Sequence, residues 1–216
     1  MEFVGREHEI AQTAATLAAG RNVVLSGKFG MGRTSLVRQV AADSRGRWKF
    51  FFGDCSQPPA AVCRQLASQL SRPRHSGRRI EEPAYREARR RLLDAAREAA
   101  PPAVFVLDNV ARMTPAKWEF LRFLSGAPRL RFVVVVESFL PESDVTRLRA
   151  CLYPSIRFRL GRLPAPRSHE FFERVSTRIG LGWSRDKIRG LVVRGGGFPL
   201  SMVEAAAEAV ARGRGR

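Results

Sequence analysis

Short apolar runs and helically spaced apolar residues alternate along most of the chain. Runs of about five apolar residues predict strands that are buried on both faces, as in a parallel sheet. Four such runs are present, at Asn22–Ser26, Trp48–Phe52, Ala103–Leu107 and Phe132–Val136. An alternating segment at Ile156–Leu160 predicts a fifth strand.

Helical patterns separate these strands. We expect helices over residues 7–19, 59–70, 82–99 and 115–124, and another directly after the first strand, where Leu36, Val37 and Val40 lie at helical spacing. The alternation of strands and helices predicts an α/β fold, a three-layer arrangement around a parallel sheet.

The pattern changes after the proline-rich segment Leu163-Pro164-Ala165-Pro166. Beyond it, apolar residues are spaced for helices at 168–179, 184–193 and 200–211. We therefore predict a core over residues 1–163, a small helical lid over 164–211 and a basic tail over 212–216 that is too short to fold.

The chain of 216 residues is strongly basic, with a net charge of +18, and 34 of its 38 basic residues are arginine. An arginine-rich proteome explains the preference for arginine over lysine, but not the excess over 20 acidic residues. Two interpretations remain open: a surface that contacts nucleic acid, and a solvated basic surface. The densest basic segment covers residues 72–79.

The sequence contains no apolar run of ~18 residues and no signal peptide, so we expect neither a membrane span nor export. Its cysteines, Cys55, Cys63 and Cys151, form no CxxC pair. We therefore expect reduced thiols in a cytoplasmic protein.

The clearest motif follows the first predicted strand. The residues Gly27-Lys28-Phe29-Gly30-Met31-Gly32-Arg33-Thr34-Ser35 fit the phosphate-binding loop G-x-x-x-x-G-K-[ST], except that Arg33 replaces lysine. The strand before the loop and the helix after it are the context that this motif requires. Glycines let successive N–H groups face one anion at the start of a helix, and the hydroxyl of Thr34 stands at the Mg²⁺ position.

The replacement at Arg33 changes the chemistry of the loop. Lysine is a compact charge, whereas arginine is larger, planar and forked. The positive charge is retained, so we expect nucleotide binding to survive. Phosphoryl transfer depends on positioning and electrostatics, so we expect it to be impaired.

A phosphate-binding loop needs an acidic partner for Mg²⁺. Asp108 follows the apolar run Ala103–Leu107, so its carboxylate should lie at the edge of the sheet beside the loop. The next residue, Asn109, cannot act as a general base.

These features together resemble AAA+ and STAND-type P-loop ATPases, including their archaeal and origin-recognition-like branches. The resemblance rests on four segments in order: Phe3-Val4-Gly5-Arg6-Glu7, the loop, Val104–Asn109, and Gly197-Phe198-Pro199-Leu200. It implies ATP or ADP as ligand with Mg²⁺ held by Thr34 and Asp108. It also implies an adenine site at Val4, Gly5 and Arg6, a lid contact from Pro199 and a polar sensor at Ser138.

Each of these roles has a structural alternative. Val4 could support the first helix, Pro199 could begin the last one, and Ser138 could cap a turn. In the resembled family a catalytic acid usually follows the Mg²⁺ aspartate, and here that position holds Asn109. With Arg33, two groups needed for hydrolysis are altered.

Four functions follow. The first is an ATP-binding switch with slow or absent hydrolysis, acting on a protein partner in trans or on identical chains in an oligomer. The second is an active DNA-associated ATPase, such as a transposition or replication accessory factor. The third is dinucleotide binding through Gly30, Gly32 and Asp54, although the four residues Ser26 to Phe29 lie between the last apolar residue of the strand and Gly30. The fourth is a scaffold without nucleotide.

Overall fold

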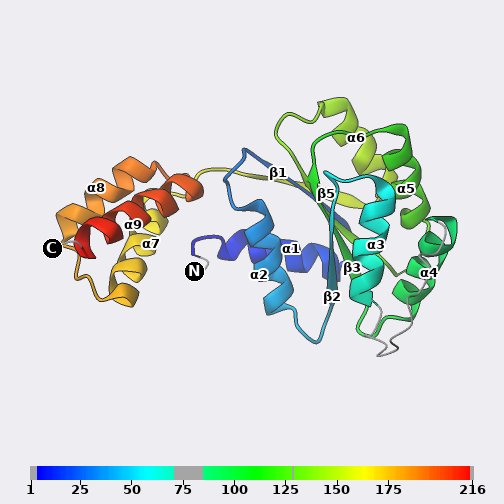
Figure 1. Ribbon diagram of the computed structural model, residues 1–216, viewed down its shortest axis with the longest axis horizontal. Coiled ribbons are helices and arrows are strands. Elements are labelled where there is room, and N and C mark those ends of the chain that lie inside the picture. Colours follow the sequence, from blue (N-terminus) through cyan, green and yellow to red (C-terminus); the bar gives the residue numbers. More distant parts are fainter. Residues whose placement is uncertain (1–3, 71–84, 128, 215–216) are drawn as a thin grey trace.

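The computed structural model describes residues 4–70, 85–127 and 129–214 (Figure 1). Its core is a five-stranded sheet in the order β2-β3-β4-β1-β5, and every adjacent pair is parallel. The strands are β1 (Asn22–Gly27), β2 (Lys49–Asp54), β3 (Ala103–Val110), β4 (Arg131–Val136) and β5 (Ser155–Leu160). The α/β fold predicted from the sequence is confirmed.

Helices cover both faces of the sheet, which makes three layers (Figure 1). The helices α1 (Glu7–Ala18) and α2 (Arg33–Asp43) pack on one face around Leu25, Leu36 and Val106. The other face carries α3 (Pro59–Leu70), α4 (Tyr85–Glu98), α5 (Pro115–Ser125) and α6 (Glu142–Cys151). There, the rings of Phe51, Phe105 and Phe132 meet edge to face, with centroids 5.9 and 6.1 Å apart.

The last three helices lie together at one end of the molecule, over the segment predicted to be a lid, and the name lid is kept for them below (Figure 1). They are α7 (Ala165–Ile179), α8 (Arg185–Gly195) and α9 (Pro199–Arg214). The lid buries its own apolar cluster, which includes Phe172, Trp183, Ile188 and Met202. In the described part of the chain, no helix has the length and apolarity needed to cross a membrane.

Several boundaries differ from the sequence expectations. Helix α6 was not predicted, because only Val145 and Leu148 of its ten residues are buried and the helical pattern is therefore weak. Strand β3 continues past Leu107 to Val110 through a shift of register. Helix α9 reaches Arg214, so most of the expected tail is helical. Phe3, the basic segment 72–79 and the first residues of the predicted helix 82–99 lie outside the described residues.

One buried amide joins three parts of the core. The Asn22 side chain donates to the Leu152 carbonyl, with 2.8 Å between Nδ2 and O. Its Oδ1 accepts from the Phe132 N–H at 2.9 Å. Strand β1 is thereby tied by a side chain to β4 and to the end of α6.

We expect Asn22→Ala to lower the free energy of unfolding by about 2 kcal/mol, because a buried N–H and a buried carbonyl lose their partner. Denaturant unfolding measures this change. Ser68→Ala, which removes an exposed hydroxyl bonded to the Gln65 carbonyl, is the control and should change stability by less than ~0.5 kcal/mol. Equal effects in the two variants would contradict the bridging role of Asn22.

Candidate functional site

The phosphate-binding loop connects the end of β1 to the start of α2. Gly30 and Gly32 have φ angles of +79° and +78°, which side chains rarely tolerate. Gly32 also caps α2, and within the described part of the chain no side-chain cap accepts a hydrogen bond from the first turn of that helix. The N–H groups of this turn are therefore oriented for an anion rather than satisfied by a cap.

The predicted Mg²⁺ pair lies beside this loop. The Thr34 hydroxyl donates to Asp108, with 2.8 Å between Oγ1 and Oδ2. The other oxygen of Asp108 accepts from the Asn109 N–H at 2.9 Å. A hydroxyl and a carboxylate that already meet fit a hard cation, because Mg²⁺ takes few protein oxygens and completes its shell with water and phosphate.

Arg33 is fully engaged within the protein. Its Nη2 lies 2.7 Å from both carboxylate oxygens of Glu137, and its Nη1 donates to the Val136 carbonyl. The side chains of Arg33 and Glu137 are only 7% and 14% exposed. The arginine that replaces the motif lysine therefore has a carboxylate partner at the end of β4.

Asn109 is directed toward the far side of β3. Its Nδ2 donates to Asp54 Oδ1 at 3.0 Å, and its φ of +56° lies in the left-handed region that asparagine tolerates. Asp54 ends β2, which lies on the side of β3 remote from the loop. Burial raises the pKa of Asp54, but hydrogen bonds from Asn109 and Ser56 outweigh it and leave this pKa below its usual value.

Two cavities adjoin the loop. The smaller, about 170 Å³, is lined by parts of the opening segment, loop and lid. It brings together six of the predicted site residues: Val4, Arg6, Met31, Gly32, Ser35 and Pro199. Gly5 instead packs against Arg167 of the lid, where a Cβ would lie 2.9 Å from the Arg167 Cβ.

The larger cavity, about 1060 Å³, extends from the loop across β5 to the lid. Gly27, Lys28, Met31 and Ser138 of the predicted set line it, together with Glu137. Among the charged side chains of its wall, basic ones outnumber acidic ones: Lys28, Arg157, Arg159, Arg162 and Arg194. Arg159, Arg162, Arg194 and Glu137 were not predicted as site residues; Glu137 could have been suspected because it directly follows an apolar strand.

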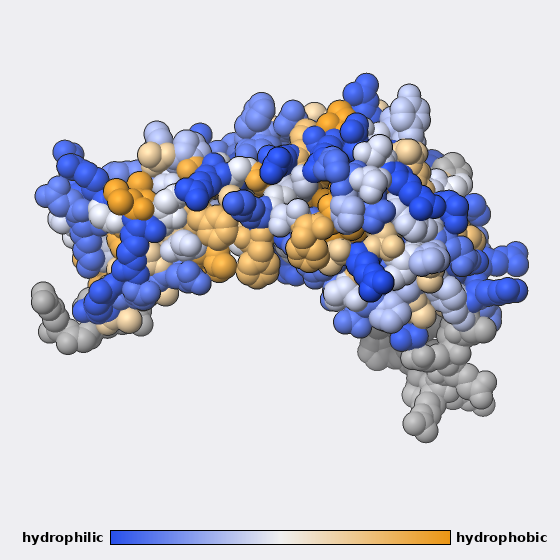
Figure 2. Space-filling model, turned by 90° about the horizontal axis from the view of Figure 1, so that it is seen from above, coloured by the Kyte–Doolittle hydropathy of each residue, from blue (hydrophilic) through white to orange (hydrophobic). Residues whose placement is uncertain are grey.

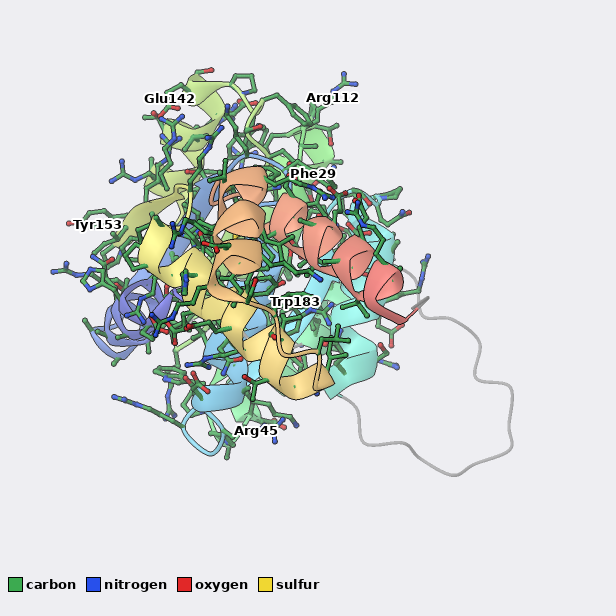
Figure 3. The ribbon with its side chains drawn as sticks, turned by 90° about the vertical axis from the view of Figure 1, so that its left-hand side faces the viewer. Phe29, Arg45, Arg112, Glu142, Tyr153 and Trp183 are labelled. Carbon is green, nitrogen blue, oxygen red and sulfur yellow. The ribbon has the colours of Figure 1, made fainter. Side chains whose placement is uncertain are left out.

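The lid touches the loop through its main chain. The Leu200 N–H, in the first turn of α9, donates to the Gly30 carbonyl at 3.1 Å. In the view from the lid, Phe29 lies beside the start of α9 (Figure 3). Seen from above, a band of apolar residues occupies the waist between lid and core, bordered by hydrophilic ones (Figure 2). The loop is thus part of the junction between the two parts.

Comparison with known proteins agrees with this geometry. A family described as AAA ATPase domain matches residues 2–136, more than half of the chain. The chain belongs to this family. The comparison with curated proteins gives no match.

Solved structures of this AAA ATPase fold include three informative neighbours. Orc1 of Aeropyrum pernix, in complex with DNA, has a TM-score of 0.70 at 18% identity, covering 99% of this chain and 60% of that one. A Walker-type ATPase of Pyrococcus abyssi has a TM-score of 0.69 at 17% identity, covering 99% and 71%. The RuvB Holliday junction branch migration motor of Thermotoga maritima has a TM-score of 0.62 at 14% identity, covering 95% and 61%. At such identities the likeness shows the fold alone, and this chain spans about three fifths of Orc1 and RuvB.

We expect Gly30→Ala to separate the lid from the loop. An added Cβ would lie 2.8 Å from the Leu200 Cβ and 2.9 Å from the Phe198 ring. Gly46 has a similar φ, +85°, and a Cβ added there would meet no atom of the described residues within 4 Å. Gly46→Ala is therefore a control for backbone strain without a clash. Gly30→Ala should cost at least ~1 kcal/mol more than Gly46→Ala in thermal unfolding.

Hydrogen exchange gives a second readout of the same comparison. The start of α9 should exchange faster in Gly30→Ala and stay unchanged in Gly46→Ala. Equal exchange in both variants would show that this contact does not hold the lid.

Proposed function

We propose that this AAA ATPase domain is a nucleotide-dependent switch that binds ATP with Mg²⁺ and hydrolyses it slowly or not at all. One observation carries the proposal. The loop and the Thr34–Asp108 pair are in place for a nucleotide, whereas the charge that should position the transferred phosphate, on Arg33, is held by Glu137.

Two features support slow hydrolysis. Phosphoryl transfer depends on exact placement of charge around the transferred group, and Arg33 can reach a phosphate only by leaving Glu137. Asn109 has no basic group and donates its amide to Asp54. Neither residue supplies a base to activate water.

The contact between lid and loop supports a switch. Gly30 belongs to the loop that would hold the phosphates, and its carbonyl accepts from Leu200 of the lid. The smaller cavity, our candidate for the adenine, is also shared by core and lid. A nucleotide that binds both parts favours one lid position, and a partner protein or a second copy of the chain reads that position.

An active DNA-associated ATPase is the second candidate. The basic wall of the larger cavity favours it, because Lys28, Arg159 and Arg162 have no ion-pair partner among the described residues. Orc1 was solved with DNA, and RuvB is named as a branch migration motor. The engagement of Arg33 and Asn109 counts against fast turnover.

The first test compares the wild type with Arg33→Lys. We expect Mg²⁺-dependent ATP binding in both, very slow single-turnover hydrolysis in the wild type and at least ~tenfold faster turnover in the variant, because lysine restores the compact charge. Calorimetry measures binding and radiolabelled phosphate release measures turnover. Brisk wild-type hydrolysis would contradict the switch, and absence of binding would leave only a scaffold.

A second test addresses DNA. If the basic cavity binds it, Arg159→Gln and Arg162→Gln should each weaken binding of a labelled duplex several-fold and reduce its salt dependence. Arg185→Gln makes the same charge change at an exposed lid position outside the cavity. Anisotropy titrations at two salt concentrations compare the three variants. Equal weakening by all three would indicate net charge rather than a DNA site.

A further inference from the structure

The pair of Arg33 and Glu137 differs from the usual phosphate-binding loop in two ways. An arginine replaces the lysine, and its charge is paired with a carboxylate. Arg33 stands where the motif lysine reaches the β- and γ-phosphates. Its side chain passes the start of the loop, because its Cδ lies 3.7 Å from where a Cβ on Gly27 would be. The guanidinium then meets a carboxylate that lines the larger cavity beside the loop.

A carboxylate and a phosphate are alternative partners for the same guanidinium. A carboxylate is planar and a phosphate is tetrahedral, but the oxygens of both can accept hydrogen bonds from the forked donors of arginine. Glu137 therefore stands in for phosphate oxygens on Arg33. It also brings a negative charge to the cavity wall that the loop presents to the end of a nucleotide.

The first two phosphates and the third would meet different environments. Main-chain N–H groups of such a loop cradle the α- and β-phosphates, so these two keep main-chain donors even when Arg33 is held by Glu137. A γ-phosphate has no such cradle and depends on the charge at the motif lysine position. There it would meet Arg33 with its charge already neutralised by Glu137.

We propose that Glu137 is a specificity-determining residue that disfavours the γ-phosphate, so that this site binds ADP more tightly than ATP. The inference rests on the proposed nucleotide site and adds its selectivity. ATP must either draw Arg33 away and leave Glu137 uncompensated, or bind beside a pair with no net positive charge, whereas ADP does neither. The resting occupant is then ADP, and exchange of the Arg33 partner from carboxylate to phosphate accompanies ATP binding.

The test measures the affinities of ADP and of the non-hydrolysable analogue AMP-PNP, with Mg²⁺, by calorimetry. We expect the wild type to bind ADP about tenfold more tightly than AMP-PNP, the effect of one partly screened charge at close range. Glu137→Gln keeps the shape and removes the charge. The ratio of affinities should then fall to near one, mainly through tighter AMP-PNP binding.

The matched control is Glu142→Gln. Glu142 lines the same cavity and pairs with Arg157, but it lies on α6 at the outer rim of the core (Figure 3). Its removal makes the same change in net charge, so the ratio should remain that of the wild type. If Glu137→Gln does not fold, the double variant Arg33→Gln with Glu137→Gln replaces it, because two amides can keep a hydrogen bond without either charge.

The outcomes separate this inference from the proposed function. A ratio near one in the wild type, or a ratio that Glu137→Gln and the double variant leave unchanged, overturns the selectivity while nucleotide binding stands. Equal shifts in the Glu137→Gln and Glu142→Gln variants overturn the specific role of Glu137. Absence of binding by either nucleotide overturns the proposed function and the selectivity together.

Discussion

The parallel pairing of β1 between β4 and β5 is the constraint on which the site depends. All six residues of β1 are buried, and Ser26 is aligned with Val136 of β4. Strands aligned in this way end at the same edge, so the loop begins beside Glu137. The next pair, β4 with β3, brings Asp108 to Thr34. The register of the strands thus brings together the loop, Asp108 and Glu137, which lie far apart in the sequence.

The positive charge of Arg33 at the end of the loop is neutralised within the protein by Glu137. A buried pair between arginine and carboxylate is strong only when both partners stay, because either charge alone in this environment is costly. Any ligand that draws Arg33 away must therefore compensate Glu137 as well. Under our proposal, the affinity for nucleotide depends on a competition between two oxyanions for one guanidinium, instead of a simple attraction to a lysine.

The parts of the fold that local pattern specifies were predictable from the sequence. Four apolar runs and one alternating segment marked the five strands, and the glycines with Thr34 and Asp108 marked the loop and the candidate metal pair. Helix α6 was not predicted because a solvated helix with two buried residues has little periodicity of apolar positions. The pairing of Arg33 with Glu137 was not predicted for another reason. Which strand lies beside β1 is a property of the assembled sheet, and only that order brings Glu137, 104 residues away, to Arg33.

Two hydrogen bonds between lid and core are made by main-chain atoms alone. Leu200 donates its N–H to the Gly30 carbonyl, and Leu163 donates its N–H to the Gly197 carbonyl at 2.7 Å. Most substitutions change a side chain and leave the peptide group intact, so substitutions of surface residues preserve these hydrogen bonds. At these two hydrogen bonds the vulnerable positions are the glycines, because at Gly197 even a methyl group would lie 2.2 Å from the Leu163 oxygen. Mutational tolerance at these two contacts is therefore broad, except at their glycines.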